Sequence, residues 1–250
     1  MEVKIIHTGS AGNCAVIDDT LIIDAGWKVN VKGIAVLLTH HHTDHMKYLD
    51  ALTGLQVYAI QYTIETLRRN MKYAYMVFNE IEDEKFYKVL SDTHEYVFRP
   101  VKVNHDVPCV GYDITRRDFD GMESKRIFFA TDFNTLTDEA RFVKNLKDKV
   151  YDAIYIEANN TLCAGDFMDV YFNDDEIVKL PKDEFHRRRS FQTHCNVDYL
   201  ISLFRRAGYS PENRFTEPVT LLHKSSTYYA YNPERVVELC KMVKIVNPIN

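Results

Sequence analysis

Four of the seven residues at positions 39–45 are histidines, and the segment reads Thr-His-His-His-Thr-Asp-His. It directly follows an apolar run that is typical of a strand. Imidazole nitrogens are costly to bury without partners, so a histidine cluster at a strand end usually binds something strongly, most often a divalent transition metal. The spacing fits two metals better than one, because His40 and His42 can point the same way while Asp44 and His45 begin the next element. A solvated polar loop is the weaker alternative.

A site for two metals needs ligands from elsewhere in the chain, and three polar residues share the context of the cluster. His105, Asp132 and His223 each stand just beyond an apolar run that is typical of a strand. A lone histidine in such a position is structural more often than functional, but together with the cluster these residues complete a ligand set. The predicted metal ligands are His40, His42, Asp44, His45, His105, Asp132 and His223.

Short apolar strands and amphipathic helices recur along the rest of the chain, which indicates an α/β fold. We find no linker and no short repeat, and we predict one domain over residues 1–250, with residues 163–190 unassigned as a possible insertion. The clearest strands are expected at 3–8, 14–17, 21–24, 34–38, 56–60, 126–130, 151–157, 218–222 and 242–246, and helices at 44–52, 63–71, 137–147, 197–207 and 233–241.

Composition narrows the class of protein further. The formal net charge is −5, whereas proteins that grip long nucleic acids usually show a basic surface. The five cysteines are scattered, which suggests reduced thiols. The chain enters a strand at once, without a signal segment, and no apolar run approaches the ~18–20 residues that span a bilayer. We therefore expect a cytoplasmic protein that does not enter a membrane.

The order of the predicted ligands resembles the metal signature of the metallo-β-lactamase-fold hydrolases. That signature consists of T-H-x-H-x-D-H, then a single His, a single Asp after an apolar strand, and a last His. The resemblance extends from residue 3 to about residue 246. It implies an αββα four-layer sandwich, with the metals at the edge where the two sheets meet.

The resemblance also implies a role for each residue. Asp24 matches a structural carboxylate in the strand before the motif, and His41 is the spare of three consecutive histidines. Five histidines and two carboxylates suit Zn²⁺, although Mn²⁺ or Fe²⁺ could load the same site. The implied ligand sets are His40, His42 and His105 for one metal, Asp44, His45 and His223 for the other, and Asp132 as the bridge between them.

Two further features place the chain within the family. A bridging carboxylate is typical of the phosphodiesterase and thioesterase branches and argues against a β-lactamase. Thr193–Asn196, which is expected to start a helix, resembles the Gly/Ser-His-x-Ser/Thr segment of RNase Z-like and YycJ-like members. Its histidine, His194, would protonate the leaving oxygen, and Asp44 is the other predicted catalytic residue; a structural histidine at a helix start is the alternative reading of His194. The loop Gly9–Cys14 also resembles the start of YycJ-like proteins.

The leading interpretation is a phosphodiesterase in which a hydroxide that bridges two metals attacks a nucleotide phosphodiester. A small or cyclic nucleotide is favoured over long nucleic acid, as in the phage anti-Pycsar phosphodiesterases of this branch. Those relatives are compact homodimers, so the resemblance also allows a homodimer here. The alternatives are a YycJ-like exonuclease on DNA or RNA and a non-catalytic, metal-stabilised binding protein. The sequence identifies no substrate-binding residues.

Overall fold

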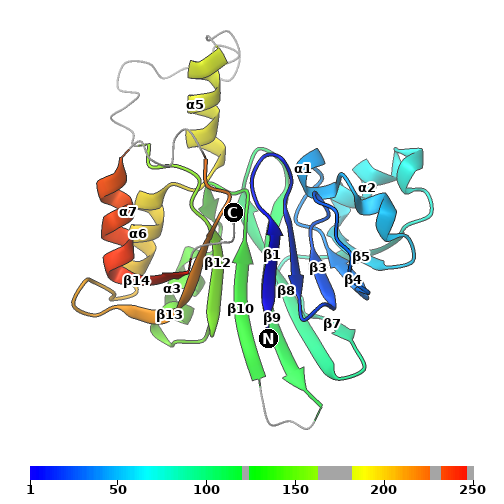
Figure 1. The fold of residues 1–250 in the computed structure, drawn as a ribbon, viewed down its shortest axis with the longest axis horizontal. Helices are drawn as coiled ribbons and strands as arrows, with labels where there is room; N and C mark the ends of the chain where they lie inside the picture. The colour runs from blue at the N-terminus through cyan, green and yellow to red at the C-terminus, as the bar shows by residue number, and fades with distance from the viewer. Residues whose placement is uncertain (120–123, 163–181, 226–231, 247–250) are drawn as a thin grey trace.

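Two β-sheets face each other in the computed structural model, which describes residues 1–119, 124–162, 182–225 and 232–246 (Figure 1). The strand order is β1-β2-β3-β4-β5-β6 in the first sheet and β11-β8-β9-β10-β12-β13-β14 in the second, where β7 also pairs with β8. The first sheet consists of β1 (Val3–His7), β2 (Cys14–Ile17), β3 (Leu21–Ile23), β4 (Ala35–Leu37), β5 (Gln56–Ile60) and β6 (Val77–Ile81). The second consists of β7 (Tyr87–Leu90), β8 (His94–Asn104), β9 (Cys109–Asp118), β10 (Ser124–Ala130), β11 (Thr135–Leu136), β12 (Ala153–Glu157), β13 (Phe215–Leu222) and β14 (Val243–Val246).

Helices cover the outer faces of both sheets. α1 and α2 lie on the side of the first sheet, whereas α3, α6 and α7 lie on the side of the second (Figure 1). None of the helices in the described part of the chain is long and apolar enough to cross a membrane. The helices are α1 (Thr43–Met46), η1 (Leu49–Leu52), α2 (Gln61–Arg68), η2 (Met71–Tyr73), α3 (Glu139–Lys147), α5 (Lys182–Thr193), α6 (Val197–Arg206) and α7 (Pro233–Met242).

Three clusters of buried apolar residues lie between four stacked layers of helices and sheets. The cluster between the sheets includes Ile23 from β3 and Phe129 from β10. A second cluster packs the outer face of the first sheet against α2, where Leu67 is buried. A third packs the second sheet against α6, where Phe204 is buried. Because an amphipathic helix or a sheet must bury its apolar face against another element, this stacking gives an αββα sandwich, and the predicted fold class is confirmed.

The strand directions bring the carboxyl ends of several strands to a common edge in each sheet. β3, β4 and β5 are parallel neighbours in the first sheet. In the second sheet β10, β12 and β13 are parallel neighbours. β8 and β10 are both antiparallel to β9, so they also run in one direction. The residues that follow these strands therefore collect at one edge.

The helix expected at residues 44–52 is two short helices in the structure, α1 and η1, so its predicted length is wrong. Backbone N–H groups from two loops donate to the carbonyl groups that would otherwise accept hydrogen bonds from the next turn of α1. The Asn13 N–H donates to the Asp44 carbonyl at 2.6 Å, and the Ala25 N–H donates to the His45 carbonyl at 2.7 Å. These bonds end α1 after one turn and tie it to the loops that follow β1 and β3.

Part of the unassigned region is a helix, α5, while residues 163–181 lie outside the described residues. None of the α5 side chains is buried, which explains why the sequence shows no apolar period there. The expectation that the segment 193–196 starts a helix needs correction. Thr193 ends α5, and Asn196 caps α6 by accepting a hydrogen bond from the Asp198 N–H at 2.7 Å.

Candidate metal centre

Polar residues at the ends of these strands meet where the edges of the two sheets come together. Their donor atoms form groups whose members lie within 4.8 Å of one another, with one shared histidine and one shared aspartate linking the groups. Six of the seven predicted ligands belong to these groups, and Asp44 does not. The groups are His40, His42 and His105; His40, His45 and Asp132; and Asp132, Glu157, His194 and His223.

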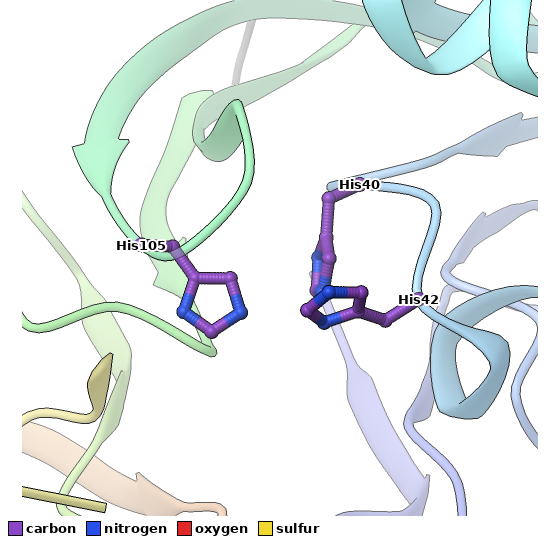
Figure 2. Close-up of side chains that lie close together, drawn as sticks. All are labelled: His40, His42 and His105. Carbon is purple, nitrogen blue, oxygen red and sulfur yellow. The ribbon is translucent and has the colours of Figure 1, made fainter. Parts of the chain in front are cut away.

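Figure 2 shows the first group, in which His40 and His42 from the loop after β4 face His105 from the loop after β8. Because a carbonyl only accepts, His105 Nδ1–H donates to the Thr193 carbonyl at 3.0 Å, which leaves Nε2 as the atom that can bind a metal. His40 is fully buried, and its Nε2 has no hydrogen-bond partner within the described residues. Burial lowers the pKa of His40 well below its usual value, so the ring is neutral, as a metal ligand must be. The three imidazoles therefore fit a metal ion.

Asp132 links the two remaining groups. Its Oδ2 lies 3.1 Å from His45 Nε2, and its Oδ1 lies 3.6 Å from His223 Nδ1. Burial would raise the pKa of Asp132, but His223 and His45 outweigh burial and hold this pKa well below its usual value. The ionised carboxylate thus directs one oxygen toward each of these two histidines, and its donor group with His40 joins it to the first group as well.

Asp24 orients His45 from the side opposite Asp132. Its Oδ2 accepts a hydrogen bond from His45 Nδ1 at 2.7 Å, and its Oδ1 accepts from the Thr39 N–H at 2.8 Å. Asp24 and His45 are both buried. Since Nδ1 is committed to Asp24, His45 presents Nε2 to Asp132 and to any metal held there.

Replacing Asp24 with asparagine should weaken metal binding about 10–100-fold, the usual effect of losing a carboxylate that orients a ligand histidine. The amide removes the negative charge that holds the Nδ1 proton of His45. Titration against a chromophoric chelator measures the affinity. Asp50→Asn is the matched control, because Asp50 lies in η1 and pairs with the half-exposed Lys72. Equal affinities for Asp24→Asn and the unmodified protein would contradict the orienting role.

Three site residues hold a left-handed backbone conformation. The φ angles are 58° at Asp24, 51° at Asp132 and 49° at His223. Positive φ is uncommon for residues other than glycine, and such strain costs about 1–3 kcal/mol and persists only where the surroundings fix it. One such constraint is visible at His223, whose N–H donates to Thr8 Oγ1 at 2.7 Å. Strained residues that converge on one point are typical of a functional site.

Asp44 and His41 lie outside the donor groups. Asp44 lines the cleft beside them, with Oδ2 at 3.7 Å from His45 Nε2, and it accepts a hydrogen bond from Asn13 Nδ2 at 3.3 Å. The structure therefore places it next to its predicted partner His45, at the solvent side. The ring of His41 lies 5.3 Å from the ring of Tyr62, consistent with its interpretation as the spare histidine.

Glu157 is a site residue that the sequence analysis missed. It ends β12, is fully buried, and its Oε1 accepts hydrogen bonds from His194 Nδ1 at 2.7 Å and His223 Nδ1 at 2.9 Å. Burial raises the pKa of Glu157, but the two histidines outweigh it and lower that pKa. Burial lowers the pKa of His194, whereas the Glu157 carboxylate outweighs it and raises that pKa. The available signal was a carboxylate at the end of an apolar strand, the context that identified Asp132.

The donor groups open into a cleft of about 610 Å³. Its walls come from the loop after β1, from α1, from α5 and from the segment after β13. The residues that give it polar character, apart from the donor groups, include Ser10, Asp44, His186, Arg189, Ser190 and Lys224. A substrate can therefore reach the ligand groups from solvent.

Residues 25–198 match the family model of the beta-lactamase superfamily domain. The chain belongs to the metallo-β-lactamase superfamily. Of the residues in the donor groups, only His223 follows the matched segment. No curated protein matches the chain in sequence. The predicted superfamily is thus confirmed by a match over most of the chain.

Solved structures share this superfamily fold. The chain is similar to the metallo-beta-lactamase fold protein YhfI from Bacillus subtilis, with a TM-score of 0.63 and 17% identity over 98% of this chain and 96% of that one. It is similar to Zn²⁺-bound PqqB from Methylobacterium extorquens, with a TM-score of 0.59 and 12% identity over 99% of this chain and 98% of that one. A long-form RNase Z from yeast gives a TM-score of 0.53 and 12% identity over 90% of this chain and 37% of that one. The chain is a metallo-β-lactamase-fold hydrolase whose His, Asp and Glu groups are suited to binding metal.

Proposed function

We propose that this superfamily member is a metal-dependent phosphodiesterase that hydrolyses a small nucleotide phosphodiester. The observation that carries the proposal is a histidine that is hydrogen-bonded to a buried carboxylate beside the ligand groups. His194 lies in one donor group with Asp132 and His223, and its Nδ1 is 2.7 Å from the carboxylate of Glu157. A thiolate leaves without a proton, whereas the sugar alkoxide released from a phosphodiester needs one. The arrangement therefore favours a phosphodiester over a thioester.

The ligand groups fit two divalent cations, and we propose Zn²⁺ for both. When bound, the cations would supply Lewis acidity toward the phosphate oxygens and activate the attacking water. Imidazole and carboxylate ligands suit Zn²⁺, and PqqB, which shares the fold, is Zn²⁺-bound. The residues that would hold the cations are His40, His42 and His105 on one side, Asp44, His45 and His223 on the other, and Asp132 between them.

His194 would deliver the proton to the leaving oxygen. Its Nδ1–H donates to Glu157, so the ring is fixed and Nε2 is the nitrogen that can give a proton away. His194 also lines the cleft, where a substrate would lie. Glu157 would act through His194 by orienting the ring and by stabilising its protonated form.

Arg189 is placed to bind the phosphate of the substrate. Of the three consecutive arginines of α5, Arg189 lines the cleft, whereas Arg187 and Arg188 pair with Glu184 of their own helix. The Arg189 guanidinium lies 2.7 Å from Asp106 Oδ2, and Asp106 Oδ1 is 3.0 Å from His105 Nε2. The Arg189 guanidinium is therefore held beside the predicted metal ligands. The Arg189 side chain is 51% exposed, so it can also contact an anion such as a phosphate.

Replacing Arg189 with alanine should raise KM for a phosphodiester about tenfold, since a hydrogen bond to a charged group contributes about 1.5–3 kcal/mol. The metal content should stay unchanged. Steady-state kinetics at two salt concentrations measure the effect. Arg188→Ala is the matched control, because Arg188 lies one position earlier in α5 and does not line the cleft. Equal KM values for the two variants would contradict a phosphate-binding role for Arg189.

A small substrate is favoured by the dimensions and charge of the protein. The cleft volume of about 610 Å³ falls within the range of roughly 300–1,000 Å³ that is typical of small-molecule sites. The net charge of −5 disfavours a long polyanion. The fold is compatible with phosphodiester chemistry, since one protein that shares it is an RNase Z.

The test is a substrate panel on purified protein of measured metal content. Bis-p-nitrophenyl phosphate, cyclic mononucleotides, short oligonucleotides and a thioester should be assayed side by side, with and without a chelator. We expect chelator-sensitive turnover of bis-p-nitrophenyl phosphate and of mononucleotide phosphodiesters. Faster turnover of oligonucleotides, with a steep salt dependence, would indicate an exonuclease instead. Full metal loading with no turnover of any member of the panel would identify a metal-stabilised binding protein.

A further inference from the structure

We propose that the stacked rings of His7 and Trp27 form the subsite for the base of a nucleotide, an inference that rests on the proposed function. The ring centroids are 4.0 Å apart, and the ring planes are inclined by 13°. His7 lines the cleft, and Trp27 is 37% exposed. A flat aromatic surface beside a phosphate site is the means by which many proteins hold a nucleobase, because every base has a π-face.

The pair is held rigidly. His7 Nδ1–H donates to the Gly12 carbonyl at 2.6 Å, which fixes the orientation of the imidazole in its plane. The loop that follows His7 is bonded to the loop that carries Trp27, since the Gly26 N–H donates to the Asn13 carbonyl at 2.9 Å. A Cβ at Gly12 would lie 2.3 Å from the Gly26 carbonyl oxygen, so only glycine allows this approach. A platform fixed before binding loses little entropy when a ligand stacks on it.

The same loops are attached to the metal centre. The Asn13 N–H donates to the Asp44 carbonyl at 2.6 Å, and a Cβ at Gly26 would lie only 1.6 Å from that carbonyl oxygen. Thr8, the residue after His7, accepts a hydrogen bond from the His223 N–H. The ring pair is therefore fixed relative to Asp44 and His223, two of the proposed ligands of one cation, as a base subsite must be if it is to set where the phosphate lies.

The geometry also indicates which surface of the pair a base would contact. One face of the His7 ring is covered by Trp27, and its Nδ1 is committed to Gly12. Because His7 lines the cleft, we infer that a base would stack on the other face of its ring, beside the Nε2 edge. Any base can stack on that face, and purines are favoured by their larger area. We therefore infer a subsite that requires a base but does not select one base over another.

Trp27 is the only tryptophan in the chain, so its fluorescence reports on this subsite directly. The protein is titrated with adenosine 5′-monophosphate and, separately, with ribose 5-phosphate, which carries the same phosphate without a base. We expect a saturable change of tryptophan emission with the nucleotide and an affinity about tenfold weaker for the sugar phosphate. Equal affinities for the two ligands would overturn the proposal. This measurement needs no turnover, so it remains decisive if the protein hydrolyses no phosphodiester.

A kinetic comparison separates base recognition from a structural role of the rings. The p-nitrophenyl ester of thymidine 5′-monophosphate and methyl p-nitrophenyl phosphate share a leaving group, and only the first carries a base. We expect His7→Ala to reduce the KM preference for the nucleotide ester about tenfold. His7→Phe, which keeps a ring that can stack on Trp27, should restore most of that preference. Tyr75→Leu is the control, because Tyr75 is 85% exposed and does not line the cleft.

Failure of this inference and failure of the proposed function give different results. If His7→Ala and His7→Phe change the kinetics of both esters equally, the rings are structural, and the phosphodiesterase proposal stands. If the nucleotide changes the Trp27 emission while neither ester is hydrolysed, the base subsite stands, and the proposed reaction is wrong.

Discussion

Replacing Asp132 with asparagine should remove metal and activity together. Asp132 is the carboxylate shared by two donor groups, and its oxygens face His45 at 3.1 Å and His223 at 3.6 Å. The amide offers one oxygen instead of two and places N–H donors where a cation would bind. Residues that merely orient a ligand already contribute about 10–100-fold, so kcat/KM should fall by more than ~100-fold. Elemental analysis after gel filtration, with kcat/KM on bis-p-nitrophenyl phosphate, measures both effects.

A control variant must distinguish loss of the metal site from loss of the folded structure. Asp113 is as buried as Asp132, but it lies in β9 and pairs with Arg99 and Arg126. Asp113→Asn should lower the free energy of unfolding by about 1–3 kcal/mol, because the buried Arg99 would keep only its ion pair with Glu84 and Arg126 would lose its carboxylate partner. It should nevertheless retain metal. An Asp132→Asn protein that keeps its full metal content and activity would show that this carboxylate is not shared between cations.

The ligand positions could be predicted because they follow from strand geometry. One polar residue directly after an apolar strand is weak evidence of function, but parallel strands end at one edge, so several such residues are expected to meet there. His105, Asp132 and His223 all have this signature, and the structure brings each into a donor group. Glu157 has it too, but it is also the last residue of the strand predicted at 151–157, and a strand residue alone does not indicate a ligand. Its role depends on the neighbouring strand, β13, which ends beside it at Leu222 and is followed by His223.

The features that the sequence did not show depend on polar contacts between distant segments. α5 buries no side chain, so it has no apolar period. It is held instead by Ser190 Oγ, which donates to Asn159 Oδ1 at 2.7 Å, and by the Arg189–Asp106 ion pair. No local propensity encodes such contacts, which connect residues 31 and 83 positions apart. The early end of α1 has the same cause, since the amides that compete for its carbonyls come from two other loops.

Removing the imidazole of His194 should have an effect that depends on the leaving group. With a sugar alkoxide as leaving group, His194→Ala should lower kcat about 10²–10⁴-fold, the usual contribution of a positioned general acid. With p-nitrophenolate, which leaves without a proton, the loss should be much smaller. Metal content is measured alongside, because His194 shares a donor group with Asp132 and His223. Full activity of a metal-loaded His194→Ala protein toward the alkoxide ester would refute its role as proton donor.

The pH dependence of activity in a Glu157→Gln variant tests whether Glu157 acts through His194. Glu157 holds the pKa of His194 above its usual value, and a general acid must be protonated at the start of the reaction. Activity that depends on protonated His194 is therefore present below that pKa and lost as the pH rises through it. The amide removes the charge that raises the pKa, so the alkaline limb of the profile should move to lower pH. If Glu157 only supported the fold, the variant would lose stability and the alkaline limb of its pH profile would not move. If Glu157 held a cation, the metal content of the variant would fall at every pH.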